Sequence, residues 1–187
     1  AKRVEAEQNG LHAYASLEEL LADPQVELVT IATPNDFHRS IAIQALEAGK
    51  NVISEKPVTL SCDDLQAMID ASKRAGKRFT VHQNRRWDED FLIMKQIYDN
   101  NTLGPVFNIE SRVHGSRGVP GDWRNRKLQG GGMILDWGVH MLDQILQMVD
   151  QPVVSVYCTV SHVTNDEVDD GFKTIITFGS GLTAQVE

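Results

Sequence analysis

The stretch Glu55-Lys56-Pro57 puts a carboxylate and an amine side by side, directly after the short apolar run of a strand. Such a pair is also typical of a strand end that simply reaches solvent. Two neighbouring strand ends carry polar groups as well, Thr33-Pro34-Asn35 and residues 82–85. Ligands of open α/β sheets bind beyond the carboxyl ends of the strands, so three such ends together indicate a pocket. Because the following proline disfavours a helical backbone at Lys56, we expect its amine to extend outward from the strand.

A second group of chemically useful residues follows the three glycines at positions 130–132. Asp136 and His140 stand four residues apart, a spacing that puts both on one face of an α-helix, and Asp143 stands a further turn along. The simpler alternative is a solvated stripe that contains an Asp–His pair. A metal site is a weaker option, because no second cluster of Cys, His or carboxylate stands at ligand spacing. The glycines indicate that the backbone closely approaches another chain segment or a ligand.

Short apolar strands alternate with amphipathic helices through the first 83 residues. The patterns predict helices at residues 1–9, 16–23, 36–48 and 61–75, and strands at residues 28–32, 52–54 and 79–81. Ser16 and Ser61 are expected to cap two of these helices. This alternation is typical of a parallel, doubly wound sheet. The first predicted domain, residues 1–83, is therefore of the α/β class, with a parallel, doubly wound sheet.

The pattern changes after residue 83. Helices are expected at residues 87–100 and 130–149, a long polar loop at 115–130, and strands at 106–113, 153–163, 172–178 and from 182 onward. Strands joined by short turns predict an α+β domain with an open, mostly antiparallel sheet at residues 84–187. One face of that sheet needs a cover, for which we expect a second subunit in a homodimer or homotetramer. The chain starts inside a helical pattern and stops inside an alternating strand, so we expect it to be a piece of a longer protein.

The composition argues against several classes of partner. The 187 residues are 41% apolar and 24% charged, and the formal net charge of −8 disfavours nucleic acid or an anionic membrane as the main partner. The basic clusters at residues 85–86 and 124–127 could still meet an anion. The sequence contains no signal-peptide pattern and no apolar run of about 18 residues, and its two cysteines lie far apart, which indicates a reducing compartment. The predicted location is the cytoplasm.

The chain resembles the Gfo/Idh/MocA family of glucose–fructose oxidoreductase and inositol 2-dehydrogenase in four motifs. In chain order these are DPQVELVTIATPNDFH, EKP, QNRRWD and GGG-x-x-x-D-x-x-x-H. The resemblance covers essentially the whole chain. It implies an NAD- or NADP-dependent dehydrogenase with an N-terminal nicotinamide-binding Rossmann domain and a C-terminal domain with an open-faced sheet. Such an enzyme would transfer a hydride between the nicotinamide and a CH–OH group, here a secondary alcohol of a sugar or cyclitol.

The resemblance also implies roles for individual residues, matched by position in the motifs. The catalytic group would consist of Lys56, Asp136 and His140. The residues along the dinucleotide would be Thr33, Pro34, Asn35, His38, Glu55 and Asn84. The residues near the nicotinamide or the substrate would be Arg85, Trp87, His114, Trp123 and Trp137. A histidine with an unperturbed pKa of about 6.5 suits removal of the hydroxyl proton near neutral pH, and a lysine can donate to the alkoxide.

The chain departs from the family pattern in one respect, because no G-x-G-x-x-G turn follows a strand. In the family, that turn and the residue that reads the ribose precede the first position present here. NAD and NADP therefore stay equal alternatives, and we expect the chain as it stands to bind either one poorly.

Two other functions stay open. One is a non-catalytic regulator of the same fold that senses a dinucleotide or a sugar, and the other is an NAD-dependent enzyme that cleaves glycosides. A regulator would usually have lost one residue of the catalytic group, and all three residues are present, which favours the enzyme.

Overall fold

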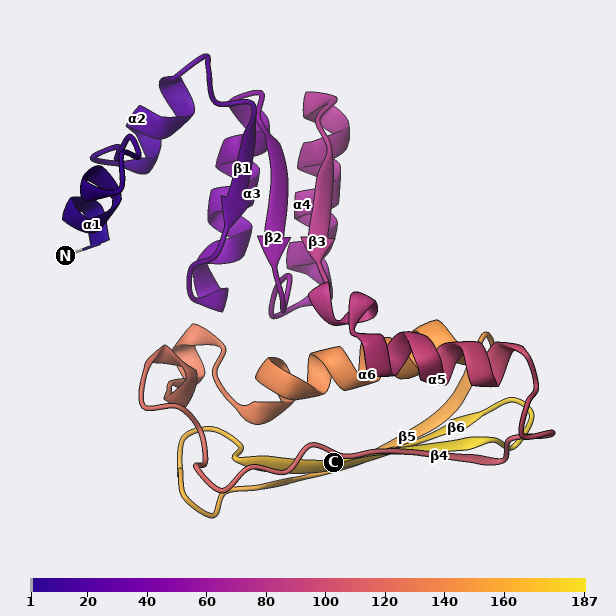
Figure 1. Cartoon of the computed structure of the whole chain (residues 1–187). Helices are drawn as coiled ribbons and strands as arrows, with labels where there is room; N and C mark the ends of the chain where they lie inside the picture. The colour runs from indigo at the N-terminus through magenta and orange to yellow at the C-terminus, as the bar shows by residue number, and fades with distance from the viewer. Residues whose placement is uncertain (1) are drawn as a thin grey trace.

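The computed structural model describes residues 2–187, which form two separate sheets. In Figure 1 the first sheet stands upright in the upper part of the molecule, and the second lies flat along the bottom. Two helices, α5 (Glu89–Asp99) and α6 (Val139–Met148), lie between the second sheet and the end of the first. The two sheets therefore meet across a layer that α6 helps to form.

The first sheet consists of three parallel strands. In spatial order these are β1 (Leu28–Ile31), β2 (Asn51–Glu55) and β3 (Phe79–His82). The helices of this part are α1 (Lys2–Gln8), α2 (Leu17–Ala22), α3 (His38–Glu47) and α4 (Cys62–Ala75). Because the strands are parallel, their carboxyl ends meet at one edge, which in Figure 1 is the lower edge, facing the second sheet.

Local capping explains where the helices of this part begin and end. The hydroxyl of Ser16 accepts a hydrogen bond from the backbone N–H of Glu19 at 3.2 Å, and Ser61 accepts one from Asp64 at 3.1 Å. Gly76, at φ +62°, ends α4 in the left-handed conformation that glycine adopts without strain. The first core is formed by residues of β1, β2, α3 and α4, namely Val29, Ile31, Ala42, Ala45, Leu46, Val52, Met68 and Ala71.

The second sheet has four strands and a mixed topology. Its strands, in spatial order, are β4 (Asn108–Ser111), β7 (Thr183–Val186), β6 (Gly171–Phe178) and β5 (Val153–Ser161). β5 pairs with β6, and β6 with β7, in antiparallel fashion, whereas β4 pairs with β7 in parallel. The predicted fold class is thus confirmed, a partial parallel α/β sheet followed by an open, mostly antiparallel one.

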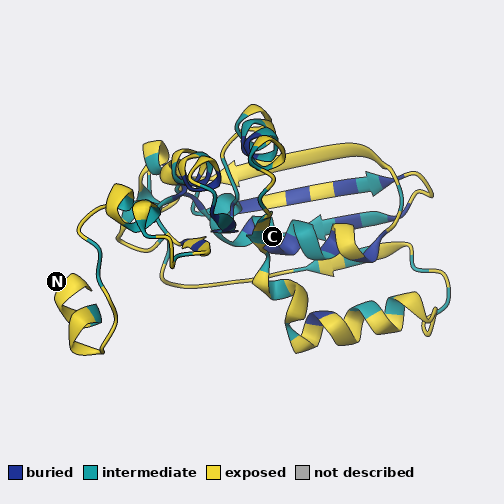
Figure 2. Cartoon of the chain, turned by 90° about the horizontal axis from the view of Figure 1, so that it is seen from above, coloured by how far each residue is buried: buried dark blue, intermediate teal, exposed yellow. Residues whose placement is uncertain are grey.

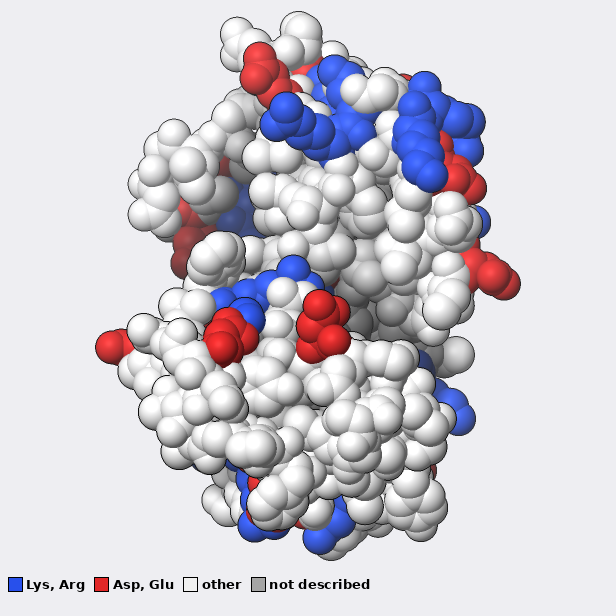
Figure 3. All heavy atoms as spheres, turned by 90° about the vertical axis from the view of Figure 1, so that its right-hand side faces the viewer, with Lys and Arg blue, Asp and Glu red and all other residues white. Residues whose placement is uncertain are grey.

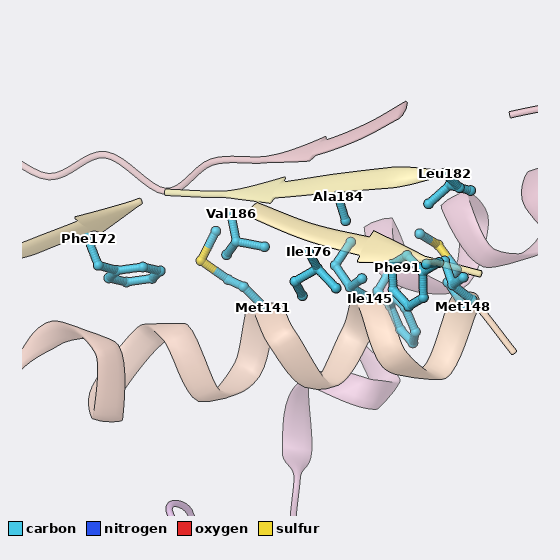
Figure 4. Close-up of a cluster of buried hydrophobic side chains, with 11 residues drawn as sticks. Phe91, Met141, Ile145, Met148, Phe172, Ile176, Leu182, Ala184 and Val186 are labelled. Atoms are coloured by element: carbon cyan, nitrogen blue, oxygen red, sulfur yellow. The ribbon is translucent and has the colours of Figure 1, made fainter. Parts of the chain in front are cut away.

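The inner face of the second sheet packs on α5 and α6. Alternate residues of β6 are buried, and Figure 4 shows how they meet apolar side chains that α6 projects toward the sheet. The labelled members of this core are Phe91, Met141, Ile145, Met148, Phe172, Ile176, Leu182, Ala184 and Val186. Because one face of α6 packs into this core, its opposite face can contact the first sheet.

The outer face of the second sheet has no cover within residues 2–187. All nine residues of β5 are exposed, whereas buried and exposed residues alternate along β6, a contrast that Figure 2 shows clearly. Tyr157 pairs with Ile175 across the two strands, so their side chains share the outer face, where they are 64% and 42% exposed. β5 is an edge strand, and edge strands with exposed apolar residues tend to pair or pack with another chain.

Two predicted elements differ in detail from the structure. The helix expected at residues 130–149 is not regular, because a π-helical turn, η5 (Ile134–Gly138), precedes α6. The loop expected at 115–130 contains two 3-10 turns, η3 (Trp123–Asn125) and η4 (Lys127–Gln129). Among residues 2–187, no helix is long and apolar enough to cross a membrane.

Candidate active site

The amine of Lys56 meets Asp136 where the two halves of the chain come together. Lys56 follows β2 immediately, and its Nζ donates to both Oδ1 and the backbone oxygen of Asp136, each at 2.8 Å. The two side chains are only 17% and 18% exposed. A lysine ammonium has three donors, and these contacts use two of them. One N–H of Lys56 therefore stays available to an oxygen atom of a bound ligand.

The carboxyl group of Asp136 is held in its ionised form. Burial raises its pKa, but the hydrogen bond and charge of Lys56, followed by the charge of Arg124, outweigh burial, and the net pKa lies below its usual value. The Nε atom of Arg124 lies 3.4 Å from Oδ2 of Asp136. Each carboxylate oxygen of Asp136 thus faces one cation.

His140 lies in the first turn of α6 and is 5% exposed. Burial lowers its pKa to about 4, and the positive charges of Lys56 and Arg85 act in the same direction. The imidazole is therefore neutral at pH 7 and has a lone pair that can accept a proton. Its Nδ1 is buried and has no hydrogen-bond partner within residues 2–187, so this nitrogen is free to bond a water molecule or a ligand.

The three glycines before η5 are each pressed against another segment of this chain. A Cβ atom on Gly130 would lie 2.6 Å from a methyl group of Leu60, and one on Gly131 would lie 2.0 Å from the backbone oxygen of Arg124. A Cβ on Gly132 would lie 2.2 Å from Oδ1 of Asp169. Of the two interpretations of these glycines, the structure therefore supports close approach of chain segments.

The same contacts account for the irregular start of the helix. Met133 and Ile134 donate their backbone N–H groups to the backbone oxygen and to Oδ2 of Asp169, at 3.0 and 2.8 Å. Asp169 thus caps this end of the helix from the β5–β6 connection. The prediction that Asp136 occupies a regular α-helix with His140 is wrong, because Asp136 belongs to the wider π-helical turn. The physical reason is that contacts distant in sequence hold residues 130–134.

The residues predicted along the dinucleotide gather at the carboxyl ends of the three parallel strands. Thr33 and Pro34 follow β1, Glu55 ends β2, and Asn84 is exposed just after β3. The Glu55 carboxylate lies 2.7 Å from Nδ1 of His82 at the end of the neighbouring strand.

Two further members of this predicted set are buried. Asn35 donates from Nδ2 to the backbone oxygen of Gly130 at 2.8 Å, a contact between the two halves of the chain. The ring nitrogens of His38 lie 2.9 Å from the backbone oxygen of Pro57 and 3.0 Å from that of Thr33. His38 has no exposed surface, so it can influence a ligand only through the two loops that it joins.

The residues predicted near the substrate fall into two groups. Trp137 and His114 line a cavity of about 840 Å³ that also includes Asp136, Ser116, Phe172 and Lys173 in its wall. Lys56 and His140 are outside this wall but touch it, Lys56 through Asp136 and His140 through an edge-on contact with Trp137, with ring centroids 6.4 Å apart. The cavity therefore adjoins the three residues of the predicted catalytic group.

The remaining predicted residues do not line the cavity. The guanidinium of Arg85 lies 4.4 Å from the ring centroid of Trp137 and thus stacks on a residue that lines the cavity. Trp123 stacks with Arg124 instead, at 4.5 Å, and Trp87 is 78% exposed in the 3-10 turn η2 (Asn84–Trp87). Within residues 2–187, no group of three or more His, Cys, Asp or Glu side chains is arranged to hold a metal ion.

Arginines of both basic clusters pair with carboxylates of the chain itself, a point that the sequence left undecided: Arg85 and Arg86 in the first cluster and Arg124 in the second. Arg86 binds Asp143 through two hydrogen bonds, from Nε at 2.8 Å and from an outer guanidinium nitrogen at 2.6 Å. Gln83 and Gln144 add hydrogen bonds between the end of the first sheet and α6. Figure 3 shows basic and acidic side chains together where the two lobes of the molecule meet. In the sequence, the only indication of this contact was that Asp143 stands one helical turn after His140, on the same face of the predicted helix.

The chain has two parts that meet at this junction, a partial parallel sheet and a mixed one, and comparison with known proteins gives their family. Residues 1–83 match the oxidoreductase family described as having an NAD-binding Rossmann fold, and residues 91–187 match the GFO/IDH/MocA C-terminal domain. The chain therefore belongs to the Gfo/Idh/MocA oxidoreductase family.

Several relatives are similar over most of the chain. A scyllo-inositol 2-dehydrogenase (NADP(+)) of Bacillus subtilis is 30% identical over 87% of this chain and 46% of its own length. A 1,5-anhydro-D-fructose reductase of Ensifer adhaerens is 32% identical over 96% of this chain and 56% of its own. The crystal structure of an NAD-binding protein from Listeria innocua has a TM-score of 0.97 and 58% identity, covering 99% of this chain and 55% of that one. The chain thus spans about half the length of the relatives that it matches.

Proposed function

We propose that this chain is part of an NAD- or NADP-dependent oxidoreductase that transfers a hydride between the nicotinamide and a secondary alcohol of a sugar or cyclitol. The observation that carries the proposal is the contact of Lys56 with Asp136 beside the buried, neutral His140. The cavity next to these residues gives a substrate room to reach them. The relatives named for scyllo-inositol and 1,5-anhydro-D-fructose support a polyol or sugar as the substrate class.

The edge formed by the three parallel strands suits a dinucleotide. Several polar side chains at this edge of the sheet are exposed or half-exposed and can therefore reach a ligand. The unpartnered Nδ1 of His140 and the third N–H of Lys56 lie just beyond the same edge. The residues proposed to hold the dinucleotide, directly or through their loops, are Thr33, Pro34, Asn35, His38, Glu55 and Asn84. When bound, the nicotinamide supplies the group that accepts or donates the hydride.

The proposed roles of the catalytic group follow from their hydrogen-bonding capacity. Lys56 directs its third N–H at the substrate oxygen and stabilises the negative charge that develops there during oxidation. Neutral His140 accepts the hydroxyl proton. Asp136 fixes the direction of the amine by taking its other two N–H groups. The pKa of about 4 makes the imidazole of His140 a weaker base than an ordinary histidine, and in the reverse direction a stronger acid.

Trp137 and His114 are proposed to contact the substrate, since both line the cavity. Arg85 would act through the face of Trp137, and Trp123 through Arg124. We further propose that residues 1–83 and 84–187 are separate domains, and that the exposed outer face of the second sheet forms a homodimer or homotetramer. The two free cysteines, Cys62 and Cys158, support a cytoplasmic location.

The test uses the full-length protein that contains this chain. It is incubated with NAD or NADP and a panel of polyols, sugars and glycosides, and both reduced nicotinamide and the organic products are measured. Net formation of a ketone with reduced cofactor supports the dehydrogenase. Binding of cofactor and sugar without any product would instead support a regulator, and cleaved glycosides without net reduction of cofactor would support the glycoside-cleaving alternative.

A further inference from the structure

Arg124 lies on the far side of Asp136 from Lys56 and is held there by three contacts. Its Nε is 3.4 Å from Oδ2 of Asp136, while Oδ1 of the same carboxylate accepts the hydrogen bond from Lys56. A second guanidinium nitrogen of Arg124 donates to Asp122 at 2.8 Å, and the guanidinium carbon lies 4.5 Å from the ring centroid of Trp123. The side chain of Arg124 is thus oriented independently of Asp136.

The backbone of Arg124 holds the same segment of the chain. Its carbonyl oxygen accepts the N–H of Gly132 at 2.9 Å and lies where a side chain on Gly131 would have to go. The backbone of Arg124 therefore fixes the start of η5, and its side chain fixes the carboxylate that η5 carries. Within residues 2–187, the charged groups that act on Asp136 are Lys56 from the first sheet and Arg124 from the loop, while the nearby His140 of α6 is neutral at pH 7.

We propose that Arg124 is a positioning residue for the reaction, because it holds Oδ2 of Asp136 so that Oδ1 is presented to the amine of Lys56. A carboxylate turns readily about its last side-chain bond, so a single cation would leave its orientation loosely defined. With a cation at each oxygen, both the carboxylate plane and the direction of Lys56 are defined. This inference rests on the proposed function, in which Lys56 directs its remaining N–H at the substrate oxygen.

The experiment compares Arg124→Gln, Arg124→Lys and the neighbouring Arg126→Gln in the full-length enzyme. Arg126 is an exposed control, because its side chain makes no ion pair within residues 2–187. Turnover is measured against pH, together with cofactor affinity and the midpoint of thermal unfolding. We expect Arg124→Gln to lower kcat about tenfold, a modest loss because Arg124 is partly exposed to solvent. Cofactor affinity should stay within about twofold, and Arg124→Lys should keep most of the activity.

The carboxyl pKa of Asp136 separates positioning from a purely structural role. Removing the charge of Arg124 takes away one cause of the lowered pKa of Asp136, so this pKa should rise in Arg124→Gln but not in Arg124→Lys or Arg126→Gln, while the acid limb of the turnover profile mainly follows His140, whose pKa is about 4. The inference is overturned if Arg124→Gln keeps the wild-type kcat, if Arg124→Lys is equally impaired, or if the loss is confined to cofactor affinity.

A second readout does not depend on turnover. The carboxyl pKa of Asp136 can be followed by NMR in wild-type protein and in the same variants, with Asp136→Asn used to assign the signal. A higher pKa in Arg124→Gln alone supports the inference, and an unchanged pKa overturns it. An inactive wild-type enzyme would reject the proposed function, whereas the titration would still decide whether Arg124 controls Asp136.

Discussion

Nζ of Lys56 and Oδ1 of Asp136 lie 2.8 Å apart, although 80 residues separate them along the chain. The lysine comes from the end of a strand in the first sheet, and the aspartate from the turn before α6. Their contact therefore depends on how the two halves of the chain dock.

Replacing Lys56 should remove the donor that stabilises the substrate oxygen. For Lys56→Ala in the full-length enzyme we expect kcat to fall about a hundredfold or more, equivalent to about 2.7 kcal/mol, with cofactor affinity nearly unchanged. Steady-state kinetics and cofactor titration measure the two effects. Lys50→Ala serves as a control, because Lys50 binds the backbone oxygen of Asp23, away from the site. A wild-type kcat in Lys56→Ala would contradict the proposed role.

His140 should make the stability of the fold depend on pH. Burial lowers its folded-state pKa from 6.5 to about 4, so between these values the unfolded chain binds more protons than the folded one. The stabilisation is fully present above about pH 6.5 and is lost as the pH falls through 4, a change of roughly 3 kcal/mol. The free energy of unfolding should therefore fall less on acidification in His140→Gln than in the wild type. Parallel curves for the two proteins would contradict this prediction.

Gly132 should be more sensitive to substitution than a glycine with only an unusual backbone angle. Gly132→Ala combines a φ of +106° with a Cβ placed 2.2 Å from the Asp169 carboxylate, whereas Gly181, at φ +87°, has no atom within 4 Å of an added Cβ. We expect Gly181→Ala to cost about 1 kcal/mol and Gly132→Ala at least twice as much. Chemical denaturation measures both values. Equal losses would show that the close approach of Asp169 adds no cost.

The two hydrogen bonds between Arg86 and Asp143 should couple the first sheet to α6. Because Asp143 is only 16% exposed, a double-mutant cycle with Arg86→Ala and Asp143→Ala should give a coupling energy of about 1 kcal/mol. The exposed pair Lys95 and Asp99, within α5, is the comparison and should give less. A coupling no larger than that of the helix pair would mean that solvent screens the junction.

The outer face of the second sheet should mediate self-association of the full-length protein. Tyr157 lies on that face, and a charge placed there would have to be buried on assembly, so Tyr157→Glu should shift the protein toward the monomer. Light scattering at high micromolar concentration measures the state. Leu103→Glu, at an exposed turn residue outside the sheet, is the control. A monomeric wild-type protein would contradict the proposed assembly.

Local sequence determined the helices, the strands and the ends of most of them. The caps at Ser16, Ser61 and Gly76 act through hydrogen bonds to residues no more than four positions away, so the same short stretches that show the pattern also make the contact. The alternation of strands and helices likewise determined that one sheet would be parallel and that its carboxyl ends would share an edge. Lys56, Asp136 and His140 were assigned to a catalytic group through the resemblance of their motifs to the family, and that role stays a prediction.

Tertiary structure alone decided what those residues touch. Lys56, the first cation beside Asp136, is 80 positions away at the end of a strand. Arg124, the second cation, belongs to a loop, and a loop has no helical or strand periodicity from which its contacts could be predicted. The π-helical turn at residues 134–138 arises because Asp169 and Arg124 hold its start from outside the helix. Such contacts depend on the docking of separate elements. Helix and strand propensities and residue spacings describe only a residue's neighbours in the sequence. The lowered pKa of His140, by contrast, depends on burial that arises only when the elements dock.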